Sequence, residues 1–139
     1  MFSSEDVLVD RFVEFLESAQ SPFAGAKVIR EFENLQARTD VVAVIGGVVI
    51  AFEAKLKDWR TALHQATRNT SFAHRSYVVM PRAEGLVAHR YSAEFQVRGV
   101  GLCLVGDNGM EVLEEAPEML AIEPWIADEA IAFANGVVQ

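Results

Sequence analysis

The sequence predicts a mixed α/β domain, and three observations indicate this class. Segments whose apolar residues recur at helical spacing alternate with β-branched runs. Two of these runs are joined by Gly46-Gly47, which is a hairpin signal. The chain has 139 residues, of which 51% are hydrophobic, and this suits a single domain over residues 1–139 with a core of its own. The expected element order is α-β-β-β-α-β-α-β-β-α, with an antiparallel meander near its start.

The first half of the chain supplies one helix and the meander. A helix is expected over residues 3–20, where Ser3 or Ser4 can cap the N-terminus and acidic residues suit the first turn. The segment SPFAG then ends this helix. Three strands are expected next, at residues 27–35, 39–45 and 48–56.

The second half alternates helices and strands. A helix is expected from Asp58 to Phe72, with a stripe formed by Trp59, Ala62, Leu63 and Ala66. The remaining elements are a strand at 76–81, a helix at 83–95, a hairpin at 100–115 whose turn is 106–109, and a helix at 124–134. Four further residues are expected in the core, together with Cys103: Met110, Met119, Trp125 and Phe133.

Composition and charge narrow the function classes. A single cysteine excludes a disulfide framework and a cysteine-built zinc site, and it favours a reducing compartment. The chain has no apolar run long enough for a membrane span, and its acidic N-terminus is unlike a signal peptide, so we expect a cytoplasmic protein. The net charge is −8, yet residues 55–90 are locally basic, whereas residues 99–139 contain no Lys or Arg. The basic middle permits a polyanionic partner.

The informative motif is the hairpin around Gly46-Gly47, because its register can be worked out. With the loop centred on these glycines, Val42 pairs with Ala51 and Asp40 lies opposite Glu53. Side chains alternate along a strand, so Asp40, Glu53 and Lys55 share one face. The other face, which contains Thr39 and Val41, is almost entirely apolar and is expected to pack on the core.

Two facing carboxylates and a nearby lysine suit metal-dependent chemistry. Carboxylates directly opposite each other in a sheet repel, and a divalent cation between them relieves the repulsion. Mg²⁺ is suited to such a site, since it needs only one or two carboxylates together with water and substrate phosphates. Lys55 lies two residues beyond Glu53 and can reach the same pocket. The set is equipped for phosphodiester hydrolysis by a metal-activated water.

These residues resemble the PD-(D/E)XK nuclease superfamily. Asp40 is followed by a hairpin and by Glu53-Ala54-Lys55 at the end of the returning strand. The resemblance covers roughly residues 4–80 and implies the restriction-endonuclease-like fold: an α-β-β-β-α-β core whose mixed sheet is flanked by helices, here followed by a C-terminal hairpin and helix. It also implies that Asp40 and Glu53 bind Mg²⁺, with Mn²⁺ as a substitute, and that Lys55 is the catalytic lysine.

The family pattern suggests two further residues. Many members use a Glu in the first helix, and Glu5 is the candidate here, with Glu31 as the runner-up. Some members have Gln followed four residues later by Tyr; Gln65 is present, but Asn69 stands at the second position. The chain also has Thr39 before Asp40 in place of the usual proline. These departures concern the subfamily, and therefore the substrate and the mode of cleavage.

Nucleic acid, and DNA because of the resemblance, is the expected partner. Lys57, Arg60 and Arg68 are candidates for contacts to the phosphate backbone. Enzymes of this fold often form homodimers, so a homodimer is plausible here. The alternative interpretation is a catalytically silent module that keeps the nuclease-like fold and acts through a protein partner, which the acidic C-terminal third favours.

Overall fold

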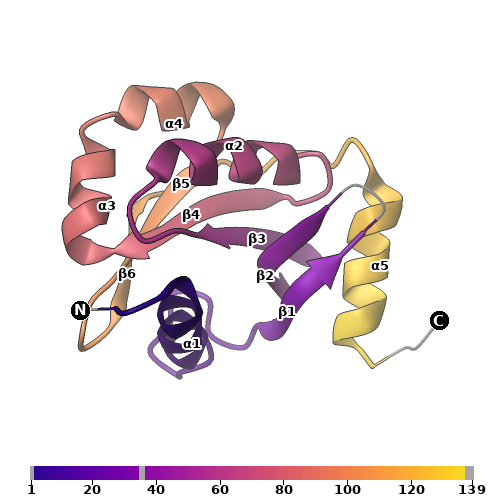
Figure 1. Cartoon of the computed structure of the whole chain (residues 1–139). Helices are drawn as coiled ribbons and strands as arrows, with labels where there is room; N and C mark the ends of the chain where they lie inside the picture. Colours follow the sequence, from indigo (N-terminus) through magenta and orange to yellow (C-terminus); the bar gives the residue numbers. More distant parts are fainter. Residues whose placement is uncertain (1, 35–36, 137–139) are drawn as a thin grey trace.

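The computed structural model describes residues 2–34 and 37–136 and shows a six-stranded sheet with helices on both faces (Figure 1). The strands lie side by side in chain order: β1 (Lys27–Glu33), β2 (Arg38–Ile45), β3 (Val48–Ala54), β4 (Arg75–Pro81), β5 (Gly101–Val105) and β6 (Met110–Glu114). The first three strands form an antiparallel meander, β3, β4 and β5 run parallel, and β6 is antiparallel to β5. The mixed α/β class and the meander are thus confirmed. Residue 35, placed in the first strand by the sequence prediction, lies outside the described residues.

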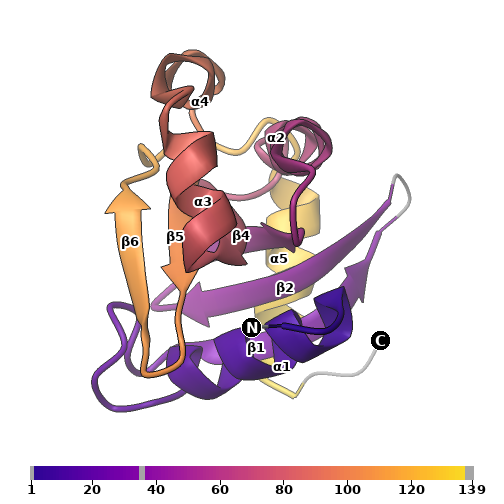
Figure 2. The ribbon, with the colours of Figure 1, turned by 60° about the vertical axis from the view of Figure 1, so that its left-hand side comes forward.

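Helices cover both faces of the sheet (Figure 2). One face is packed by α1 (Glu5–Leu16), which is capped by the Ser4 hydroxyl, one of the two serines predicted for this role. The opposite face is packed by the other helices: α2 (Trp59–Asn69), α3 (Arg82–His89), α4 (Ser92–Arg98) and α5 (Pro124–Ala134). None of the described helices is long and apolar enough to cross a membrane.

Both faces of the β2–β3 hairpin are buried, whereas the sequence analysis expected only one face to pack on the core. Val41 and Phe52 pack beneath α1, while Val42 and Ala51 pack beneath α5, and all four side chains are almost fully buried. The physical reason is that the mixed sheet carries helices on both sides, which buries both sides of its central strands. Asp40 and Glu53 therefore lie at the edge of a core and not on a solvated surface.

The helix expected at 83–95 is two helices in the structure. At Arg90 and Tyr91 the backbone hydrogen bonds are of the 3₁₀ type, because each N–H donates to the carbonyl oxygen three residues earlier. The break places the ring of Tyr91 against Trp59 of α2, with the ring centroids 4.8 Å apart, while Phe95 is fully buried. Helical spacing alone cannot show such a break, because the aromatic contacts that accompany it come from another helix.

The side chains expected in the C-terminal core differ in burial. Cys103 is fully buried, as predicted, and burial raises the pKa of its thiol well above the usual value. Met119, Trp125 and Phe133, by contrast, are 39%, 60% and 63% exposed, so their assignment to the core was wrong. For Trp125 and Phe133 the reason is that α5 packs on the sheet through the opposite face, formed mainly by Ile126, Ala127 and Ala130.

Gly101, at the start of β5, is where a side chain would do most harm to the sheet. A Cβ at this position would lie 2.4 Å from the backbone oxygen of Glu114 and 2.5 Å from the Tyr77 ring. We therefore expect Gly101→Ala to destabilise the protein by about 1–3 kcal/mol, the usual cost of overpacking, as measured by urea denaturation. The matched control is Gly109→Ala, where nothing lies within 4 Å. Equal stabilities of the two variants would contradict the tight packing of β5.

Candidate functional site

The β2–β3 hairpin has the register predicted from its sequence. Val42 pairs with Ala51 and Val41 with Phe52. The ladder ends at Val41–Phe52, so Asp40 and Glu53 are the next residue on each strand, and their carboxyl groups share a hydrogen bond. The Asp40 carboxylate accepts a hydrogen bond of 2.9 Å from the backbone N–H of Ala54. Asp40 is therefore fixed at the end of β3, next to Glu53.

Glu53 is buried and is held by a chain of hydrogen bonds that starts on β2. Its side chain is only 2% exposed. The Asn69 amide donates to Oε2 of Glu53 at 2.7 Å, and the Thr39 hydroxyl donates to Oδ1 of the same amide at 3.0 Å. Thr39 was expected on the face away from Glu53, and this was wrong. Thr39 still pairs with Phe32 of β1, but the β1–β2 ladder has no pair between Glu31 and Asp40. Glu31 also has a φ of 55°, so the regular alternation of side chains is interrupted between Val41 and Thr39.

Burial gives Glu53 a pKa close to neutrality. Removal of the carboxylate from water is the largest cause and raises its pKa from 4.5 to about 7. The hydrogen bond from Asn69 opposes this rise, and so does the charge of Arg68. The charge of Asp40 and its hydrogen bond with Glu53 raise the pKa further. Near neutral pH, Glu53 thus exchanges between a carboxylate and a carboxylic acid that donates to Asp40.

Lys55 lies at the end of β3 and is brought together with Glu5. The Nζ atom is 3.6 Å from the Glu5 carboxylate, and its side chain is 24% exposed. Within the described residues, no ion pair joins Lys55 to Asp40 or to Glu53. The pairing of Glu5 with Lys55 places the first turn of α1 at the end of β3, where the family resemblance expects an acid.

Asn69 is a residue of the candidate site to which the sequence analysis gave no role. It ends α2 and is 2% exposed, since it continues the buried stripe that contains Leu63 and Ala66. A polar amide at the end of an apolar stripe is a signal that the sequence does contain, because buried polar groups are hydrogen-bonded. Gln65 lies one turn earlier on α2 and is half-buried.

The candidates for phosphate contacts differ in their surroundings. Lys57 is exposed, and Arg68 is exposed on α2 and close enough to Glu53 to lower its pKa. Arg60 forms an ion pair of 2.9 Å with Glu94 and lies 4.2 Å from the centroid of the Trp59 ring, so part of its charge is already compensated.

Glu31, the alternative acid, lies on the edge strand β1 in an unusual backbone conformation. Its backbone has a φ of 55°, in the left-handed region that few side chains adopt. The carboxylate is 69% exposed and lies 3.8 Å from Arg38. This carboxylate is therefore paired with Arg38 at the surface, whereas the acid that pairs with Lys55 is Glu5.

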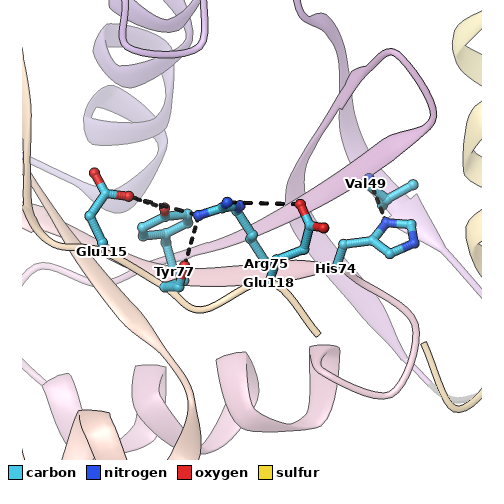
Figure 3. A network of polar contacts seen from close by, with 7 residues as sticks. Val49, His74, Arg75, Tyr77, Glu115 and Glu118 are labelled. Atoms are coloured by element: carbon cyan, nitrogen blue, oxygen red, sulfur yellow. Dashed lines mark hydrogen bonds and ion pairs between the residues drawn. The ribbon is translucent and has the colours of Figure 1, made fainter. Parts of the chain in front are cut away.

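A second polar network lies at the amino end of β4 (Figure 3). Arg75 donates to the carbonyl oxygen of Ala116 at 2.9 Å and lies 3.8 Å from Glu118 and 4.0 Å from Glu115. The Tyr77 hydroxyl donates to Glu115, and burial raises its pKa to about 12. Arg75 thus connects β4 with the segment that follows β6.

Comparison with known proteins places the chain in a structural class without naming an activity. No family model matches the chain, and no curated protein matches it. A solved structure, the SPO1766 protein of unknown function from Silicibacter pomeroyi, is similar with a TM-score of 0.68 and 17% sequence identity. The similarity covers 98% of this chain and 87% of that one. It shows a shared α/β fold with a mixed sheet flanked by helices, and the fold alone.

Proposed function

We propose that the protein is a metal-dependent nuclease that hydrolyses phosphodiester bonds in DNA. The observation that carries the proposal is the buried contact between Asp40 and Glu53. A fold that holds two carboxylates together in a desolvated place gives up stability. The raised pKa of Glu53 is the sign of that cost, and occupation of the site by a divalent cation would offset it.

The residues present fit Mg²⁺. Oxygen atoms of Asp40 and Glu53 are the ligands that this ion prefers, and it commonly uses one or two carboxylates while water and substrate phosphates complete its shell. No group of three or more His, Cys, Asp or Glu side chains that could hold a metal occurs in the described part of the chain. The site therefore offers two carboxylate ligands, and the substrate would supply further ligands to the ion.

The protein residues around this pair have distinct tasks in the proposed reaction. When bound, the metal ion would neutralise phosphate charge and lower the pKa of a coordinated water. Asn69 orients the Glu53 carboxylate, and the Ala54 N–H orients that of Asp40. Lys55, held by Glu5, supplies a positive charge at the end of β3 and orients the attacking water. Arg68 and Lys57 are exposed, and their positive charges would contact the phosphate backbone of the DNA.

The test is metal binding and metal-dependent cleavage with the same protein preparation. We expect Mg²⁺ or Mn²⁺ to raise the melting temperature of the wild type and to support cleavage of plasmid or single-stranded DNA. In Asp40→Asn both effects should disappear, since one of two ligands loses its charge. The matched control is Asp10→Asn, at an exposed position on α1 that pairs with Arg30. Cleavage that persists in EDTA, or in Asp40→Asn, would refute the metal site.

A silent module that acts through a partner protein remains the second candidate, and one surface favours it. Large apolar side chains are exposed between β6 and the end of α5, among them Leu120 at 93% and Ile122 at 78%. Exposed apolar residues grouped in this way often indicate an interaction site. Absence of both the metal-induced stabilisation and the cleavage would favour this second candidate.

A further inference from the structure

An aromatic stack with an exposed outer ring lies where α2 meets α4 (Figure 1). The Trp59 ring is stacked with the rings of Tyr91 and Phe95, whose centroids lie 4.8 Å and 5.8 Å from its own. Exposure increases outward through the stack, because Phe95 is fully buried, Trp59 is 9% exposed and Tyr91 is 41% exposed. Among the described aromatic contacts, Trp59 is the one ring that Tyr91 meets. The Tyr91 ring is therefore held in place by a neighbouring helix while much of its surface is open to solvent.

A guanidinium group lies beside this stack. The Cζ atom of Arg60 is 4.2 Å from the centroid of the Trp59 ring and 5.3 Å from that of Tyr91. Glu94 of α4 forms an ion pair of 2.9 Å with Arg60, which keeps the guanidinium group next to the rings. Aromatic rings and arginine planes are the surfaces on which unpaired bases stack. Any of the four bases can stack in this way, because each has a π-face.

The exposed face of α2 leads from this stack to the candidate active site. Arg60, His64 and Arg68 recur every four residues and are all exposed, so they share one face of the helix. From Arg60 to Arg68 the helix rises about 12 Å, at about 1.5 Å per residue. The charge of Arg68 lowers the pKa of Glu53, and the next residue, Asn69, donates a hydrogen bond to the same carboxylate. The stack and Glu53 thus lie at opposite ends of α2.

The charge along this face suits a polyanion. The helix α2 itself contains no Asp or Glu. Lys57, directly before it, is exposed, and no ion pair of the described residues involves Lys57 or Arg68. Two acids lie nearby: Asp58 caps the helix, and Glu94 compensates part of the charge of Arg60. Lys57 and Arg68 are therefore the cations left for phosphate groups, one near each end of α2.

We propose that Tyr91 is a stacking platform for one unpaired base of single-stranded DNA, whose phosphates contact Lys57 and Arg68 along α2. The inference rests on the proposed nuclease function for the identity of the strand, and it adds a preference for single-stranded over duplex DNA. A base inside a duplex is already stacked on its neighbours, so its π-face is not accessible to the tyrosine. Binding then has two parts: stacking on the ring, and charge contacts that salt weakens.

The test is binding of a short thymidine strand to the whole protein in EDTA, followed by fluorescence anisotropy at several salt concentrations. Tyr91→Ala should weaken binding by about tenfold, within the range for loss of one stacked base. The slope of log affinity against log salt concentration should keep its wild-type value, because no charge is lost. Tyr91→Phe keeps the ring and should bind like the wild type. The matched control is Phe133→Ala, which removes an exposed aromatic ring from α5.

Arg68→Ala tests the charge contacts separately. It should reduce the steepness of the salt dependence by about 0.7, which is the contribution of one phosphate contact with a single strand. Its control is Arg30→Ala on the edge strand β1, where the arginine pairs with Asp10, and this variant should keep the wild-type slope. An unchanged slope in Arg68→Ala would refute the path of the strand along α2.

The outcomes separate this inference from the proposed function. Unchanged affinity in Tyr91→Ala, or an equal loss in Tyr91→Phe, refutes the platform whether or not the protein cleaves DNA. Equal or tighter binding of a duplex of the same length refutes the preference for single strands. A loss that occurs in Tyr91→Ala and not in Tyr91→Phe supports the platform, even if metal ions neither bind nor support cleavage. Should Tyr91→Ala melt below the assay temperature, Tyr91→Leu takes its place, because leucine keeps an apolar contact with Trp59 but has no π-face.

Discussion

Replacement of Lys55 by alanine is expected to lower metal-dependent DNA cleavage by at least about 100-fold, within the range for loss of one group that orients or activates a nucleophile. The lysine is the cation at the end of β3, and Glu5 holds its side chain by an ion pair of 3.6 Å. The stability of the protein should change by less than about 1 kcal/mol, since a partly exposed ion pair contributes little. Initial rates of plasmid cleavage, measured beside thermal melting, separate the two effects.

The control for this variant is another lysine whose loss leaves the site intact. Lys27 bonds Asn135 and pairs across the sheet with Val44, at the opposite end of β2 from Asp40. Lys27→Ala should therefore cleave DNA like the wild type. Glu5→Gln serves as the positioning variant: it keeps Lys55 but removes its anionic partner, so a smaller loss of rate is expected. Full activity in Lys55→Ala would remove this lysine from the reaction and leave the metal ligands as the remaining part of the proposal.

Much of the fold follows from local patterns in the sequence. The pair Gly46-Gly47 fixes the β2–β3 turn, and both residues have positive φ values, which glycine adopts without strain. Since hydrogen bonding propagates the register from the turn, the pairs from Ile45–Val48 to Val41–Phe52 could be predicted from the spacing alone. The limits of α5 also agree with the sequence prediction, because Pro124 marks its start.

The remaining features depend on contacts between distant parts of the chain. Asn69 and Glu53 are 16 residues apart, and only the packing of α2 on β3 brings the amide to the carboxylate. The break between α3 and α4 likewise accompanies the contact of Tyr91 with Trp59. Thr39 reaches the network because the β1–β2 ladder is interrupted at Glu31 and Asp40. Hydrophobic periodicity and secondary-structure propensity each describe one segment of the chain, so they carry no information about contacts between distant segments.

Glu53→Gln is expected to stabilise the metal-free protein at about pH 8, by up to about 3 kcal/mol, because about 1.4 kcal/mol corresponds to each unit of pKa shift. The folded protein binds a proton on Glu53 with a pKa of about 7, whereas the ordinary value is 4.5. The folded state therefore holds more protons than the unfolded state between these values, so the wild type loses stability as the pH rises from about 5 to about 7 and loses no more above it. An amide at this position imitates the protonated carboxyl: its oxygen accepts from Asn69, and its NH₂ group donates to Asp40.

The measurement is urea denaturation in EDTA across this pH range, with Glu129→Gln on the exposed side of α5 as the matched control. The advantage of Glu53→Gln over the wild type should shrink toward about pH 5 and reach its maximum above about pH 7, whereas the control should follow the wild type. Two results would show that the carboxylate pair does not destabilise the fold. One is a wild-type free energy of unfolding that does not change over this pH range, and the other is a Glu53→Gln variant that is less stable than the wild type at about pH 8. If the predicted gain is found together with loss of the response to Mg²⁺, the same carboxylate destabilises the empty site and binds the ion. That combination is typical of functional sites, where activity is retained at the expense of stability.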